Sequence, residues 1–142
     1  MSVKQISVFL ENKPGTLCSL TEVLSKNNID IRALTLSETK DFGIVRLIVD
    51  DVLDACAVLK EEGFVNALTA VLAIVIPDET GGLNKLLKVF EENKINVEYM
   101  YATPGGKNSK APYMIFRVTD TEVAEKALAK TGLEILDQES LY

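Results

Sequence analysis

The stretch LENKPGTL at residues 10–17 decides the fold, because it returns 66 residues later as IPDETGGL at residues 76–83. In both copies an aliphatic run ends in turn-forming residues, and a glycine then precedes leucines at helical spacing. Residues 8–32 and 74–98 share six identities in 25 positions, where chance would give roughly one or two. Further along, the offset grows to 69, and the extra residues fall between Thr103 and Pro112. The chain is therefore an internal duplication.

The first copy has the pattern of strand, helix, strand, strand, helix and strand. Alternating apolar residues predict strands at 5–10 and 29–35, and a β-branched run predicts another at 44–49. A helix is expected from Thr16 to the stop at Asn27-Asn28. A second helix is expected to be capped by Asp50 or Asp51 and closed by Gly63 in a left-handed conformation, before a last strand begins at Phe64.

The second copy repeats this order, with strands expected at 71–76, 95–102, 113–118 and 134–136 and helices at 82–93 and 121–130. Strand, helix, strand, strand, helix, strand (βαββαβ) is the ferredoxin-like unit, in which two helices cover one face of an antiparallel sheet. The fold class is thus α+β, with one unit at residues 1–68 and another at 69–142. Because residues 70–76 are apolar at both parities, we expect this strand to be buried on both faces and the two units to pack together.

The composition of the 142 residues limits the chemistry. The net charge is −6, 47% of the residues are hydrophobic and His is absent, so no mechanism can use imidazole. No cluster of Lys and Arg predicts binding to nucleic acid, and no apolar run approaches the roughly 18 residues of a membrane span. Cys18 and Cys56 both lie in helix patterns, which predicts buried, reduced and inert thiols and a cytoplasmic location.

No enzyme signature is found in the sequence. It has no GxGxxG, Walker or GxSxG motif and no metal-ligand spacing, so we expect no catalysis, no cofactor and no metal. The segment GGKNSK at residues 105–110 contains glycines and lysines, but it links two strands and no helix follows it. It is interpreted as a hairpin, with a lid over a ligand as the alternative.

The two glycine-containing turns are the candidate binding sites. A glycine before a helix permits a tight turn and leaves the first N–H groups uncovered, and these donors at the positive end of the helix dipole suit a carboxylate. Glycine is common in any strand-to-helix connection, so one such turn would be explained by structure alone. Two turns at the same repeat position, at Gly15 and Gly81, favour a binding function.

A second repeated element starts the second strand of each unit, as NIDI at residues 28–31 and KINV at residues 94–97. The isoleucines and Val97 are expected to face the helices. Asp30 and Asn96 lie on the other parity, where each is available to a ligand amino group or simply supplies polarity at a strand start.

An aliphatic strand followed by Asn-x-Pro-Gly-x-Leu, and then by Asn-Ile-Asp-Ile about a dozen residues later, resembles the ACT domain, a small-molecule-binding regulatory module. The second copy departs from this pattern with Asp78 in place of the Asn and Thr80 in place of the Pro, although Gly81 and Leu83 fit. The resemblance implies an ACT–ACT pair, with an amino acid bound between the glycine turn of one unit and the second strand of another. The ligand-binding residues that follow are Asn12, Pro14, Gly15, Thr16, Leu17, Asp30, Ile31, Asp78, Gly81, Gly82, Leu83, Asn96 and Val97.

The expected function is a non-catalytic regulatory protein that senses a free amino acid through paired ACT units. The expected partners are that amino acid and a separate metabolic enzyme regulated in trans, with no nucleic acid and no membrane; a homodimer is left open. The alternative is a protein–protein interaction or dimerisation module that regulates an enzyme without a ligand. An acylphosphatase-like hydrolase on the same scaffold is disfavoured, because neither turn contains the Arg it would need.

Overall fold

The computed structural model describes residues 2–103 and 112–141. The expected hairpin or lid at residues 105–110 lies outside the described residues. The chain divides into two compact units. We call Lys4–Thr69 the N-terminal unit, and Ala70–Tyr142 together with Met1–Val3 the C-terminal unit.

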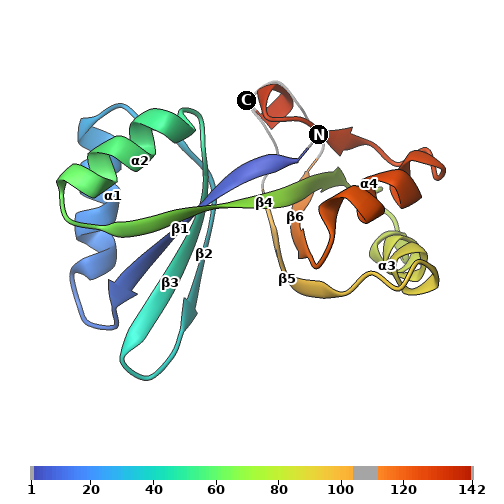
Figure 1. The fold of residues 1–142 in the computed structure, drawn as a ribbon, viewed down its shortest axis with the longest axis horizontal. Coiled ribbons are helices and arrows are strands. Elements are labelled where there is room, and N and C mark those ends of the chain that lie inside the picture. Colours follow the sequence, from blue (N-terminus) through green and yellow to red (C-terminus); the bar gives the residue numbers. More distant parts are fainter. Residues whose placement is uncertain (1, 104–111, 142) are drawn as a thin grey trace. The chain divides into compact units, whose positions relative to one another are not determined.

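The N-terminal unit is built from β1 (Val3–Glu11), α1 (Thr16–Lys26), β2 (Ile31–Glu38), β3 (Phe42–Val49), α2 (Val52–Glu61) and the first half of β4 (Val65–Val75). Its strand order is β2-β3-β1-β4, with β3 antiparallel to both β1 and β2. Both helices pack on one face, where Leu20 and Leu24 of α1 and Leu59 of α2 join a core with alternate residues of β1 and β3. Figure 1 shows α1 and α2 next to each other on this unit. The expected ferredoxin-like fold is confirmed.

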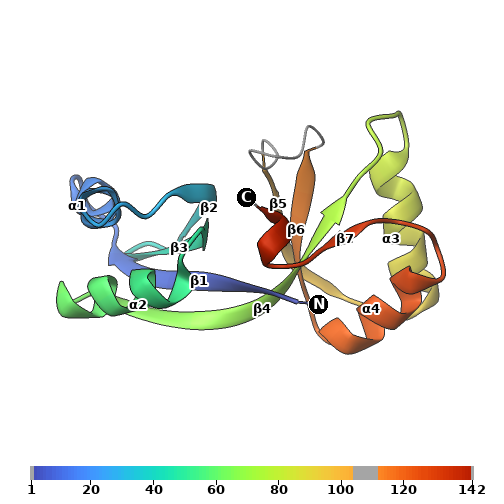
Figure 2. The ribbon, with the colours of Figure 1, turned by 90° about the horizontal axis from the view of Figure 1, so that it is seen from above.

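The C-terminal unit continues with α3 (Gly82–Glu92), β5 (Val97–Ala102), β6 (Tyr113–Val118), α4 (Thr121–Ala129), β7 (Ile135–Leu136) and the 3-10 helix η1 (Glu139–Leu141). Its strand order β7-β4-β6-β5 repeats that of the first unit. Figure 2 shows α3 and α4 on the same side of these strands. Their core includes Phe90 and Phe116, whose rings meet edge to face at 5.7 Å. None of the described helices is long and apolar enough to cross a membrane.

The two strands expected around residues 64–76 are one strand, β4, which runs without interruption from Val65 to Val75. No Gly or Pro lies between these residues to break the extended backbone. Val71, Leu72, Ala73 and Ile74 are all fully buried, so this part of the strand is covered on both faces as the apolar run predicts. Val75 and Ile76 are only half-buried. The packing of the two units stays a prediction.

The second strand of each unit begins later than the sequence pattern suggests, at Ile31 and Val97. Asn28 and Lys94 both have a φ of 55°, in the left-handed region. The N–H of Ile29 donates to the carbonyl of Leu24 at 3.0 Å, and Ile95 repeats this with Phe90 at 2.8 Å. These bonds form a Schellman closure, so Ile29 and Ile95 belong to the helix ends and not to the strands. Gly63, with a φ of 83°, closes α2 as expected.

The expectation that both cysteines are buried is wrong for Cys18, which is exposed. In α1 the side chains facing the sheet are those of Leu17, Leu20 and Leu24. Cys18 is turned about 100° from Leu17 and lies on the solvent face. Cys56 is partly buried against the core of the N-terminal unit, and this burial raises the pKa of its thiol.

Candidate functional site

Glycine occupies the N-cap of two of the four α-helices in the described part of the chain. Gly15 precedes α1 with a φ of 91°, and Gly81 precedes α3 with a φ of 84°. In contrast, the carboxylates of Asp51 and Asp120 accept backbone N–H groups at the starts of α2 and α4. A glycine has no side chain to do this, and the first turns of α1 and α3 carry no acidic residue. No side chain therefore caps the leading amides at either glycine turn, although the backbone carbonyl of Glu79 accepts the Gly82 N–H at 3.1 Å in the C-terminal one.

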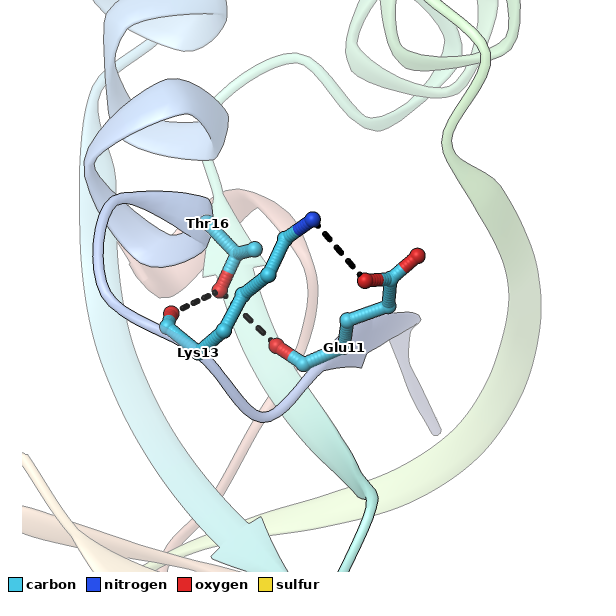
Figure 3. Close-up of polar contacts among 3 residues, drawn as sticks. All are labelled: Glu11, Lys13 and Thr16. Atoms are coloured by element: carbon cyan, nitrogen blue, oxygen red, sulfur yellow. Dashed lines mark hydrogen bonds and ion pairs between the residues drawn. The ribbon is translucent and has the colours of Figure 1, made fainter.

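Side chains of the N-terminal turn reinforce its backbone. The Thr16 hydroxyl lies 2.9 Å from the Glu11 carbonyl oxygen and 3.0 Å from that of Lys13, as Figure 3 shows. The Lys13 ammonium reaches the Glu11 carboxylate at 3.0 Å between their Nζ and Oε2 atoms. The Asn12 side-chain amide donates to Glu38 Oε2 at 3.2 Å. The turn thus links the end of β1 to the start of α1 and to the end of β2, while Pro14 and Gly15 lie exposed.

A cavity of about 280 Å³ lies beside this turn. Antiparallel pairing places Leu10 of β1 opposite Gly43 of β3, and Leu36 of β2 opposite Val45. The cavity has an apolar part formed by leucines and a charged rim. Its lining residues are Leu10, Glu11, Asn12, Lys13, Thr16, Leu17, Leu36, Glu38 and Gly43. Three of the residues expected at the site, Asn12, Thr16 and Leu17, are therefore brought together.

The C-terminal turn has the same glycine but is more tightly closed. A Cβ atom on buried Gly82 would lie 2.5 Å from the carbonyl oxygen of Pro77. The Gly82 N–H donates to the Glu79 carbonyl at 3.1 Å, and the Glu79 carboxylate pairs with Lys85 at 2.9 Å. Of the other expected site residues here, Asp78 and Gly81 are exposed and Leu83 packs partly against the core.

The expected residues at the second strands lie at the opposite end of the helix from the glycine turn of the same unit. Eleven residues of α1, about 16 Å of helix, separate Gly15 from the segment that includes Asp30 and Ile31. These two line a different, more open cavity of about 510 Å³. The Asp30 carboxylate is paired with Arg32 at 2.8 Å. In the C-terminal unit Asn96 is exposed, Val97 packs against the core, and the Asn96 carbonyl accepts the N–H of Thr119.

Sequence reasoning missed Leu36, Glu38 and Gly43, which come from the β2–β3 hairpin. In a ferredoxin-like unit the first strand pairs with the third, so the end of β1 lies opposite the start of β3. Applying this pairing to residues 40–43, which precede the strand expected at 44–49, would have placed Gly43 next to Leu10.

Comparison with known proteins identifies relatives of the whole chain. A family model described as an ACT domain pair matches residues 1–142. The chain is similar to the crystal structure of protein BT0572 from Bacteroides thetaiotaomicron, with 36% sequence identity, a TM-score of 0.92, and coverage of 100% of this chain and 96% of that one. No curated protein matches it.

The fold is also that of two regulatory subunits of aspartate kinase. The subunit from Thermus thermophilus is 17% identical with a TM-score of 0.62, covering 91% of this chain and 92% of that one. The subunit from Thermus flavus is 14% identical with a TM-score of 0.57, covering 89% and 90% respectively. At these identities the likeness concerns the fold alone.

Proposed function

The chain belongs to the ACT domain pair family, and from this premise we propose that it is a non-catalytic regulatory protein that senses a free amino acid. The ACT domain pair is a regulatory module rather than a catalytic one. The observation that carries the proposal is the N-terminal glycine turn, where an uncapped helix start adjoins a cavity.

A zwitterion fits the chemistry of this turn. Its carboxylate would accept N–H groups at the start of α1, which lie at the positive end of the helix dipole. Its ammonium would meet the Glu38 carboxylate, which lines the same cavity and already accepts one hydrogen bond from Asn12. Both charged groups of the ligand thus have a partner at this turn, and neither partner is a basic side chain. The Lys13 ammonium, which lies near the turn, is paired with the Glu11 carboxylate at 3.0 Å.

The remaining ligand residues are proposed on the basis of the family resemblance. Within the two turns these are Pro14, Gly15, Asp78, Gly81, Gly82 and Leu83. Asp30, Ile31, Asn96 and Val97 would act from another ACT unit, because none of them shares a turn with the glycines of its own unit. The pairing of Asp30 with Arg32 implies that an incoming ammonium would compete with the guanidinium for that carboxylate.

The proposed partners are the amino acid and a separate metabolic enzyme that the protein regulates in trans, and we propose that the protein forms a homodimer. We also propose a cytoplasmic location, because the two unpaired cysteines suit a reducing compartment.

The test is calorimetric titration of the full chain with each of the twenty amino acids, with thermal shift as a second readout. We expect one or a few to bind, and a ligand at 100 times its Kd should stabilise the fold by about 2.7 kcal/mol. Gly15→Val or Gly81→Val places a β-branched side chain where the backbone turns, and binding should fall at whichever turn is occupied.

The strand residues are tested in the same titration. Asp30→Ala and Asn96→Ala should each remove a hydrogen bond to the ammonium, worth about 1.5–3 kcal/mol of binding free energy if they act as proposed. If no amino acid binds below millimolar concentration, or if binding ignores all four substitutions, the proposal fails.

A second function is favoured by the apolar surface of the N-terminal unit. Phe9 is 48% exposed and Phe42 is 59% exposed, and in register they stand opposite Ile44 and Glu11 on the sheet face away from α1 and α2. A protein–protein interaction module that regulates an enzyme without a ligand would use such a surface. Under this alternative, a double Phe9→Ser and Phe42→Ser variant would lose association with its enzyme, whereas Gly15→Val would not.

A further inference from the structure

Gly43 is a glycine that its backbone does not require. The described glycines with positive φ are Gly15, Gly63, Gly81 and Gly132, and Gly43 is not among them. It is buried on the helix-facing side of β3, where the next positions on that side are the fully buried Val45 and Leu47. A Cβ atom on Gly43 would lie 3.1 Å from Leu36 Cδ1. Because Gly43 carries no side chain, the Leu36 side chain lies against its backbone, and both residues line the cavity.

Leucines surround this space. Leu10 is buried, Leu17 is half-buried, and Leu36 is 50% exposed although it faces the helix side, opposite Val45. A large apolar side chain left half in water next to a cavity is a surface that an apolar ligand group would cover.

The charges lie at the rim of the cavity. Glu11 and Glu38 provide two carboxylates, and the single ammonium, that of Lys13, is paired with Glu11. The excess negative charge disfavours an acidic ligand side chain. A charged side chain placed among the leucines would lose its hydration without a partner there, which is unfavourable.

On these grounds, and resting on the proposed function, we propose that the N-terminal cavity selects an amino acid with an uncharged aliphatic side chain, and that Gly43, which has no side chain, lets Leu36 form the apolar wall of that cavity. The volume of about 280 Å³ is near the lower end of known ligand sites, which suits one amino acid rather than a nucleotide. Leu10, Leu17 and Leu36 contact the side chain, Glu38 accepts from the ammonium, and the start of α1 receives the carboxylate.

The experiment is calorimetric titration of the full chain with glycine, alanine, valine, leucine, glutamate and lysine. Wild type should bind valine or leucine at least about tenfold more tightly than glycine, since even one methylene in an apolar pocket gives discrimination of this size and these side chains add three or four carbons. Gly43→Ala should weaken valine and leucine binding by about tenfold or more and change glycine binding little. Leu36 can yield to the new methyl because its side chain is half in solvent, so the fold should persist.

Ser37→Ala is the matched control, because Ser37 follows Leu36 on β2 and lies on the opposite face of the sheet, across from Ile44. It should bind as wild type does. Leu36→Ala is the second variant, and it should also weaken leucine more than glycine by removing apolar contact.

The inference is overturned if glutamate or lysine has the highest affinity and Gly15→Val abolishes that binding. It is also overturned if Gly43→Ala and Leu36→Ala lower the affinities for glycine and for leucine equally. In both cases the proposed sensing function survives. If none of the twenty amino acids binds, the proposed function itself fails.

Discussion

The two glycine turns have the same backbone conformation at the glycine and differ in the residue that follows it. In the N-terminal turn the first helical residue is Thr16, whose hydroxyl binds the carbonyls of Glu11 and Lys13. In the C-terminal turn the same position is Gly82, which lies so close to the Pro77 carbonyl that a Cβ would meet it at 2.5 Å. Each turn is thus stable for a different reason, one through a side chain and the other through close backbone packing.

This difference shows how a duplicated chain can keep a fold and diverge at its sites. The repeated features, the left-handed glycine and the helix start without a side-chain cap, are backbone properties that both units have kept. The features that shape a pocket, such as Thr16, Leu36 and Gly43 in the N-terminal unit, are side-chain choices that either copy can change without altering the topology.

The largest effect on the free energy of unfolding is expected when the residues that follow the two glycines, Thr16 and Gly82, are exchanged. Gly82→Thr forces atoms against a backbone carbonyl and should lower the free energy of unfolding by about 3 kcal/mol. The reciprocal Thr16→Gly loses the hydroxyl bonds and gains chain flexibility, and should lower it by only about 1–2 kcal/mol. Urea denaturation followed by circular dichroism measures both. Thr16→Ser keeps the hydroxyl and serves as the control; equal losses for the two exchanged variants would remove the distinction between the turns.

The shared backbone of the turns predicts equal effects at their glycines. Nothing lies within 4 Å of a Cβ placed on Gly15 or Gly81, so Gly15→Ala and Gly81→Ala introduce only the strain of positive φ. Each should lower the free energy of unfolding by about 1–2 kcal/mol, with the two values close to each other. A much larger loss at one glycine, in the same denaturation experiment, would mean that the two backbones are not equivalent.

The capped helices provide the next comparison. Asp51→Ala removes the acceptor for the Asp54 N–H at the start of α2, and Asp120→Ala does the same for Glu122 and Val123 in α4. Each should reduce stability by about 1 kcal/mol, as lost N-caps do. Amino-acid affinity should not change, because neither cap lines the cavity beside α1. If these variants lost amino-acid binding while remaining fully folded, the glycine turns would not be the binding site.

The smallest effect is expected at Cys18, whose counterpart in the second copy is Asn84. Because Cys18 is exposed, Cys18→Asn should alter the free energy of unfolding by less than about 0.5 kcal/mol. In the wild type, iodoacetamide should modify Cys18 in the folded protein and reach Cys56 much more slowly. Burial raises the pKa of the Cys56 thiol, so its thiolate forms only at a pH above the ordinary range, and its labelling should increase there. Mass spectrometry over a pH series would show the reverse order if Cys18 were shielded.

Features determined by local chemistry were predictable from the sequence. The left-handed glycines, the Asp51 cap and the Asn28 and Gly63 helix ends each follow from residues within a few positions. The exposure of Cys18 was also accessible, because the helical phase set by Leu20 and Leu24 turns it to solvent. The interpretation erred by weighing residue type above helical position.

Features that depend on distant pairing were not predicted. Gly43 reaches the turn through its pairing with Leu10, which lies 33 residues earlier in the chain. Leu36 reaches it through Val45, its partner on β3, which pairs in turn with Val8 on β1. The continuity of β4 was missed because both of its halves have the composition of a strand, and only the absence of a breaking residue distinguishes one strand from two.

The central claim is that an aliphatic amino acid binds in the cavity beside the N-terminal glycine turn. The most direct test is to titrate the isotope-labelled protein to saturation with each of the twenty amino acids in turn and to follow the backbone amide chemical shifts. An aliphatic amino acid should shift the amides of Gly15, Thr16 and Leu17 together with that of Gly43, and the same dissociation constant should fit all four. Fitted shifts confined to other parts of the chain, or no shift with any of the twenty amino acids, would contradict the account.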